Sequence, residues 1–448
     1  MRAFVPLCFL TLLMSVLTGC GNSETGESEA SKTKSATKSP SHVQKKSGPS
    51  TDPKVVQAVT TLLDQAEKFS KAGQHSKAVE ALSQAIGLDA SNSRIYLHRA
   101  RASVALGQHA NALADFGTAI QLAPNDAKLH NERGVFLLTR ANLPQAYRDL
   151  SNAIRLNPKS SQAYNNRGFL LLAQGKYQEA IRDFDEAIKR DDKFVDALNN
   201  RGFGYLKLRK PKAALEDFNR ALAIDANSSN AYNNRGLAKM DLKQWKSAAE
   251  DFTQAIKRNP ESVLFYRHRR SAYYQMGMTN AARADERMIL QLVQLGALSR
   301  QVSSAPLKSE GYLERGKFYA KLNMHDKAIV DFTRAINLQK VPSANCLAKR
   351  AASYLAKREY QKAIADCTAA INQEPHLLAY SVRGDAYAAL NDFERAIADY
   401  ASAKRFDSAV AKTYLRHANA LEAKGQVQLA SEAREKAKAL DPTLKSAN

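Results

Sequence analysis

The chain has 448 residues and a formal net charge of +22, because it contains 66 lysines and arginines against 44 aspartates and glutamates. Its nine histidines are dispersed, and we find no nucleophile motif and no glycine-rich phosphate loop. The sequence therefore indicates neither an enzyme nor a metal or cofactor site, and no small-molecule substrate is expected.

The N-terminus predicts export. An apolar run from Ala3 to Leu17 follows Arg2 and ends in Leu17-Thr-Gly-Cys20. Such a run is typical of a secretory signal and is too short to span a membrane. Its ending resembles the bacterial lipobox, which implies a signal peptide at 1–19 and lipidation of Cys20. The alternative is an ordinary signal peptide with a chance cysteine. We expect an exported lipoprotein, anchored to the cell membrane or the outer membrane.

The stretch after the lipidated cysteine predicts a flexible tether at 20–58. Residues 21–52 are rich in serine, lysine, threonine and glutamate and contain no aromatic residue. A segment of this composition cannot bury enough apolar surface to fold. It is expected to link the lipid to the folded part of the chain.

From residue 59 onward the sequence repeats itself every 34 residues. Tyr164 and Gly168 lie on one face of a predicted helix, and Ala180 and Phe184 lie on one face of a second. Gly175 separates the two helices, as a glycine C-cap does. The period is clearest in two sets of residues: Gly168, Gly202 and Gly236, and Phe184, Phe218 and Phe252.

This pattern resembles the tetratricopeptide repeat family. The resemblance covers almost all of the chain after residue 58 and implies an all-α fold, a right-handed α-solenoid superhelix of about eleven helix-turn-helix units. It also implies that the partner is another protein. The units are predicted to begin near Val59, Ser93, Ala127, Ser161, Val195, Ser229, Val263, Ser309, Ala344, Leu377 and Ala411.

One interruption divides the predicted array. The seventh unit has Glu286 and Ile289 where other units have an aromatic residue and alanine, and an extra stretch follows before the register resumes. We therefore expect seven units at 59–296, an insertion at 297–308 that marks a bend or a boundary, four units at 309–444, and a tail at 445–448.

Nine units carry an arginine in the first helix and an aspartate sixteen residues later. Both partners are absent from the first and the last unit, which favours a contact between the two helices of one unit. A guanidinium grips a carboxylate through two hydrogen bonds. We interpret the pairs as structural locks; the alternative is an arginine row that binds acidic partners. The pairs are Arg99 with Asp115, Arg133 with Asp149, Arg167 with Asp183, Arg201 with Asp217, Arg235 with Asp251, Arg269 with Asp285, Arg315 with Asp331, Arg350 with Asp366, and Arg383 with Asp399.

Two asparagine rows in units three to six are candidates for partner binding. The first row lies on one helix face with an apolar stripe, about 100° from the core face. Amides and apolar side chains together would grip an extended peptide in a concave groove. The alternative is that the stripe packs on the neighbouring unit and that the asparagine rows only cap helices or face solvent. The row is Asn131, Asn165, Asn199 and Asn233, and the stripe includes Phe169, Phe203 and Leu237.

The second row is Asn166, Asn200 and Asn234. Its placement before Arg-Gly is similar to the asparagine ladder of O-linked N-acetylglucosamine transferase, which implies contact with peptide backbone. This chain has arginine where that family has leucine and lacks the transferase domain. The sequence leaves open which row faces the groove.

Two further groups each allow two interpretations. Arg267, His268, Arg269 and Arg270 form the densest basic cluster, either a binding patch or a solvated helix end. Cys346 and Cys367 fall on the two helices of the ninth unit, where a disulfide or a buried thiol would fit; we favour the thiol, because Cys367 stands at a core aromatic position.

These observations predict a membrane-anchored scaffold or adaptor of the bacterial cell envelope that binds a peptide or helix of another protein in its concave groove. The alternative is a binding module for an anionic envelope polymer or lipid headgroup, based on the basic excess. Nucleic acid is not expected, because the chain is predicted to be exported.

Overall fold

The computed structural model describes residues 50–444. The predicted signal peptide, Cys20 with its lipid, tether residues 20–49 and the tail at 445–448 lie outside the described residues. Within 50–444 there are 22 helices and no strand, so the predicted all-helical repeat fold is confirmed. No helix of this part is both long enough and apolar enough to cross a membrane.

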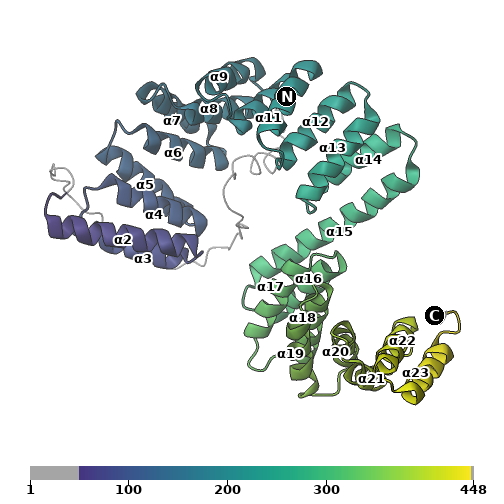
Figure 1. The fold of residues 1–448 in the computed structure, drawn as a ribbon. Helices are drawn as coiled ribbons and strands as arrows, with labels where there is room; N and C mark the ends of the chain where they lie inside the picture. The colour runs from purple at the N-terminus through teal and green to yellow at the C-terminus, as the bar shows by residue number, and fades with distance from the viewer. Residues whose placement is uncertain (1–49, 445–448) are drawn as a thin grey trace. The chain divides into compact units, whose positions relative to one another are not determined.

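The helices follow one another as pairs, a first and a second helix in each unit (Figure 1). The first helices are α2 (Pro53–Lys71), α4 (Ser93–Ala105), α6 (Ala127–Thr139), α8 (Ser161–Ala173), α10 (Val195–Lys207), α12 (Ser229–Asp241), α14 (Val263–Gln275), α16 (Ser309–Lys321), α18 (Ala344–Ala356), α20 (Leu377–Ala389) and α22 (Ser408–Ala423). The second helices are α3 (His75–Leu88), α5 (His109–Leu122), α7 (Leu143–Leu156), α9 (Tyr177–Arg190), α11 (Pro211–Ile224), α13 (Trp245–Arg258), α15 (Thr279–Ser304), α17 (His325–Asn337), α19 (Tyr360–Ile371), α21 (Phe393–Ser402) and α23 (Val427–Leu440).

Two first helices begin earlier than the repeat predicts. Helix α2 begins at Pro53, because Asp52 accepts a hydrogen bond from the Lys54 amide and proline fits the first helical position. Residues 53–58 are therefore helical and not part of a tether. Helix α22 begins at Ser408, where the Asp407 carboxylate accepts from two backbone amides at 3.0 and 3.1 Å.

The chain divides into two compact units between Leu292 and Val293, inside α15. We call residues 50–292 the N-terminal array and residues 293–444 the C-terminal array. Residues 297–304, expected to be an insertion, are the last turns of α15. The helix continues because its sequence contains no proline and because Leu292, Leu295 and Val302 are buried.

In five units the close approach of the two helices depends on a glycine opposite an aromatic side chain. A Cβ atom on Gly202 would lie 2.7 Å from Cε1 of Phe218, which is a steric clash. Unit nine has Ala351 in place of the glycine and Cys367 in place of the aromatic residue, so the larger residue on one helix faces a smaller one on the other, and both are fully buried.

Cys367 is a free thiol, and burial raises its pKa to about 12. Cys346 is also free and buried.

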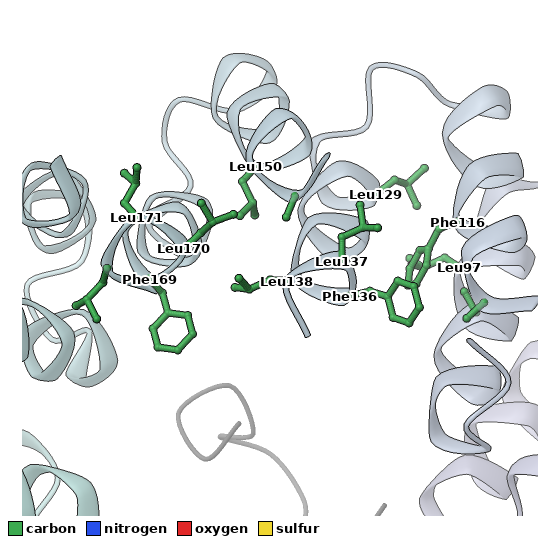
Figure 2. Close-up of a cluster of buried hydrophobic side chains, with 14 of the residues drawn as sticks. Leu97, Phe116, Leu129, Phe136, Leu137, Leu138, Leu150, Phe169, Leu170 and Leu171 are labelled. Atoms are coloured by element: carbon green, nitrogen blue, oxygen red, sulfur yellow. The ribbon is translucent and has the colours of Figure 1, made fainter. Parts of the chain in front are cut away.

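In units two to four of the N-terminal array, apolar side chains of neighbouring units merge into one cluster. Figure 2 shows this cluster between Leu97 and Leu171, in which α6 and α8 contribute Leu137, Leu138 and Leu170. Burial of such side chains contributes about 1.5–3 kcal/mol each and is the main force that stacks the units. Each unit therefore depends on its neighbour to cover its apolar surface.

The structure brings the two members of all nine Arg/Asp pairs together, each between the first and second helix of one unit. Nε and Nη2 of Arg167 donate to the two carboxylate oxygens of Asp183, both at 2.8 Å. The Asp183 side chain is 9% exposed and the Arg167 side chain 21%. The same two-bond contact recurs in the other eight units.

The aspartates of units five and six are enclosed more fully. Asp217 is 2% exposed and accepts from Nε and Nη2 of Arg201 at 2.8 and 2.6 Å. Asp251 is 4% exposed and accepts from Arg235 at 2.9 and 2.7 Å, and its second oxygen lies 2.7 Å from the Lys239 ammonium. Both carboxylates lie in the interior and are bonded within their own unit, so neither Asp217 nor Asp251 belongs to a surface that a partner could reach.

Eight of the nine arginines also make a bond that the 34-residue pattern alone does not predict. Nη1 of Arg167 donates to Ser151 Oγ, on the second helix of the preceding unit, at 3.3 Å. The exception is Arg133, because the equivalent position is Gly117, which has no side-chain acceptor. The arginine thus joins two units as well as two helices. The acceptors are Ser83, Ser151, Asp185, Asn219, Thr253, Ser299, Thr333 and Thr368.

Candidate partner-binding cavity

The two asparagine rows do not form the open wall of amides that their spacing led us to expect. Asn165 is 5% exposed and Asn200 is 4% exposed. Each asparagine of the second row donates from Nδ2 to a first-row asparagine of the preceding unit. The bonds are Asn166 to Asn131 at 3.0 Å, Asn200 to Asn165 at 3.1 Å and Asn234 to Asn199 at 3.0 Å.

These bonds make the rows an interhelical ladder. The first helices lie close enough to bury both faces, and a buried amide must find a partner inside the protein. Asn233 and Asn234 are buried in the same way, while Asn131 is half-buried. In this structure the amides therefore hold neighbouring units in register and are not available to a peptide.

The side chains of the apolar stripe are buried in unit four and partly exposed in units five and six. Phe169 is 4% exposed and packs in the core with Leu138 and Leu172, so it is not a surface residue. Phe203 and Leu237 are half-buried. The next residue of the stripe is Ser271, whose small side chain covers little of its neighbours.

A cavity of about 320 Å³ lies at this point. Helix α10 contributes Phe203 and Leu206, and α12 contributes Leu237 and Met240. Phe203 and Leu237 belong to the stripe predicted from the sequence, but the site spans units five to seven and not three to six. The remaining lining residues are Phe252 of α13, His268 and Ser271 of α14, and three charged residues, Lys207, Arg209 and Asp241.

His268 takes the place of an asparagine at the end of the ladder. It stands 34 residues after Asn234, and its Nδ1 lies 2.7 Å from Asn233 Oδ1. Its ring also lies 5.5 Å from the ring of Phe252. Burial, reinforced by the charge of Arg267, lowers the pKa of His268 to about 4. The imidazole is therefore neutral at pH 7.

The hydrogen bonds around His268 determine which ring nitrogen carries the proton. Asn233 donates from Nδ2 to Asn234 Oδ1 at 3.1 Å, which leaves the Asn233 oxygen as an acceptor. Nδ1 of His268 must then be the donor, and Nε2 of the neutral ring is an acceptor. No protein group within residues 50–444 bonds to Nε2, so it is the nitrogen available to a ligand.

The cavity has a partly basic rim. The Lys207 ammonium lies 4.9 Å from the centroid of the Phe203 ring, and burial, with Arg209 nearby, lowers the pKa of Lys207. Arg209 occupies the left-handed turn (φ 58°) in which unit four has Gly175. Asp241 is the one acidic residue of the lining.

The basic cluster at 267–270 differs from a patch of four exposed cations. Arg269 is held by Asp285 at 3.0 and 2.6 Å, and Arg270 contacts Glu286 at 3.3 Å. His268 is neutral, as described above. Arg267 is exposed. The cluster therefore adds far less charge to the surface than its composition suggests.

Sequence reasoning missed the role of two residues. Ser271 opens the cavity because it interrupts a stripe of large side chains, and the interruption is visible at the 34-residue period. His268 was noted only for its basic neighbours, although it aligns with the second asparagine row. Within the described part of the chain no group of three or more histidine, cysteine, aspartate or glutamate side chains could hold a metal ion.

Comparison with protein families identifies the repeat. Models described as "Tetratricopeptide repeat" match residues 161–194, 195–228 and 229–262, residues 63–127 and 349–411, and residues 309–341. Together these matches cover more than half of the chain. A search of curated protein sequences found no significant relative.

Several solved structures are similar to parts of the chain. MamA 41-end from Desulfovibrio magneticus RS-1 is 23% identical, with a TM-score of 0.35, and the match covers 38% of this chain and 96% of that one. Pseudomonas aeruginosa pilF is 17% identical, with a TM-score of 0.43 and coverage of 47% and 96%. YrrB, described as a TPR protein with an unusual peptide-binding site, is 20% identical, with a TM-score of 0.33 and coverage of 40% and 91%.

Proposed function

Because the chain belongs to the tetratricopeptide repeat family, whose members bind protein partners, we propose that it is a scaffold that takes a peptide or helix segment of another protein into the cavity of α10, α12 and α14. The cavity carries the proposal. An apolar hollow that stays open in a folded chain is a common mark of a binding site.

The composition of the cavity supports a peptide more than a free metabolite. At about 320 Å³ it is at the lower end of the range of ligand pockets, roughly 300–1,000 Å³. It has room for one or two side chains of a longer segment. The rest of that segment would run along the first helices, where the array offers further surface on either side.

Ser271→Phe is expected to abolish partner capture, because it places in α14 the side chain that unit five has at Phe203 and so fills the cavity. The measurement is crosslinking in intact cells, with the full chain as bait, followed by identification of the captured proteins. Ser303→Phe adds the same ring at an exposed site of α15 and should leave capture unchanged.

Two outcomes are distinguishable in that experiment. Loss of one partner with Ser271→Phe alone supports the proposal, and equal capture by both variants contradicts it.

The second candidate function, binding of an anionic envelope polymer or lipid headgroup, is favoured by the charge of +22. Binding of that kind would collapse between low and moderate salt and would ignore Ser271→Phe, whereas an apolar contact should persist.

We further propose that the scaffold is exported and held at a bacterial membrane by a lipid on Cys20, as an adaptor of the cell envelope. The lipobox-like Leu17-Thr-Gly-Cys20 supports this, since two or three acyl chains give stable anchoring. Cys20→Ala is expected to move the protein from the membrane fraction to the soluble fraction. An unchanged distribution on fractionation of the cells would rule the anchor out.

A further inference from the structure

The available nitrogen of His268 makes the cavity more selective than an apolar hollow. The ring is held from two sides, by the bond to Asn233 at 2.7 Å and by Phe252 at 5.5 Å, so Nε2 has a fixed position. An acceptor in an apolar surrounding favours a ligand that brings a donor, because an apolar ligand would bury the nitrogen without a partner.

The rest of the lining suits a flat apolar body. Phe203 and Leu237 are contributed by adjacent first helices, and Met240 is a flexible side chain that adapts to an aromatic ring. A tyrosine or tryptophan side chain combines an aromatic body with one polar hydrogen at its end. Phenylalanine and leucine have the body without the donor, and lysine brings a charge that an apolar cavity disfavours.

From this geometry, and resting on the proposed function, we infer that the cavity recognises a donor-bearing aromatic side chain, tyrosine or tryptophan, whose hydroxyl or indole N–H donates to His268 Nε2. The aromatic side chain would be the anchor of a partner peptide.

The charges at the rim indicate the residues beside that anchor. Lys207 and Arg209 outnumber Asp241, and Lys207 is partly desolvated beside Phe203. The partner segment is therefore expected to carry glutamate or aspartate next to the aromatic residue.

The test uses the full chain and three synthetic peptides that differ only in one central residue, tyrosine, phenylalanine or leucine, with two glutamates on either side. Dissociation constants are measured by calorimetry at pH 7 and fixed salt. The tyrosine peptide is expected to bind about tenfold more tightly than the phenylalanine peptide, as one hydrogen bond with a buried acceptor implies.

Two variants separate recognition from folding. His268→Asn keeps the ladder, since Asn234 already fills the equivalent position, but its shorter side chain removes the acceptor from the cavity. It should bind the tyrosine and phenylalanine peptides equally. Arg209→Gly places in this turn the glycine that unit four has at Gly175, and it removes one cation from the rim. The peptides with flanking glutamates should therefore bind severalfold more weakly.

Equal binding of tyrosine and phenylalanine peptides to the unchanged chain, both blocked by Ser271→Phe, would overturn this inference and leave the proposed function standing. A tyrosine preference that survives His268→Asn would overturn it as well. Failure of all three peptides to bind would contradict the recognition of an aromatic anchor, while capture in cells would still test the proposed function independently.

Discussion

Asp183→Ala is expected to lower the free energy of unfolding by about 3–5 kcal/mol, the usual cost of removing one partner from a buried ion pair. Asp183 receives two hydrogen bonds of 2.8 Å from Arg167 and is 9% exposed. Without it, the guanidinium stays between α8 and α9 with one remaining hydrogen bond, to Ser151. The loss comes from the stranded charge more than from the missing contact.

The first unit of the array provides the matched control. It has Gln65 and Ala81 where other units have arginine and aspartate. The double variant Arg167→Gln with Asp183→Ala copies that arrangement and removes the stranded charge. It is expected to recover most of the stability that the single variant loses.

Urea unfolding followed by circular dichroism would measure both variants. Amide hydrogen exchange across α8 and α9 would show whether the loss is local, since repeat arrays do not always unfold in one step. A cost below about 1 kcal/mol for the single variant would mean that the pair behaves as an exposed ion pair.

Acidification from pH 6.5 to pH 4 is expected to destabilise the N-terminal array by roughly 3 kcal/mol through His268 alone. The pKa of this group is lowered from 6.5 to about 4 in the folded chain. Between these values the unfolded chain binds a proton that the folded chain does not, so stability falls as the pH falls. At about 1.36 kcal/mol for each pH unit, the difference is roughly 3 kcal/mol. Well above pH 6.5, where the unfolded chain has also lost this proton, the contribution no longer changes.

The groups around His268 explain the sign. Burial is the main cause, because it disfavours the charged form of the ring, and the charge of Arg267 adds to it. Lys207 and Arg209 share the cavity lining with the ring, where Asp241 is the one acid. Asn233 is neutral, so it cannot stabilise the imidazolium as a carboxylate would.

His268→Asn isolates this effect, because it places an uncharged residue of the ladder at the same position. Urea unfolding at pH 7, 5.5 and 4.5 should give a difference between the two proteins that grows as the pH falls. Parallel stability profiles would show that His268 is protonated without penalty in the folded chain.

The fold could be predicted from the sequence because the information for it is local and repeated. Nine of the eleven first helices begin at the residue that the period predicts, and each Arg/Asp pair could be assigned from a constant spacing. The exposure of the asparagine rows could not be assigned. A helical period identifies a face but not what covers it, and here the adjacent first helix covers two faces that lie about 100° apart.

The candidate site was predictable in part for the same reason. Phe203 and Leu237 were recognised as one stripe, but the cavity depends on where that stripe stops, at Ser271. Unit seven departs from its neighbours elsewhere too. Arg270 and Glu286 stand where unit six has Gly236 and Phe252, and they form an ion contact in place of close packing. That two such substitutions compensate each other can be recognised only once the contacts between them are known.

The third hydrogen bond that eight of the arginines make affects which changes in the number of repeats the fold can accept. Loss of residues 195–228 would place Asp185 sixteen positions before Arg235, where Asn219 stands now, and both side chains offer an oxygen. Where the residue brought into this position has a side-chain acceptor, recombination between units can therefore lengthen or shorten the gene in steps of 34 codons, and the arginine at the new junction keeps its third hydrogen bond.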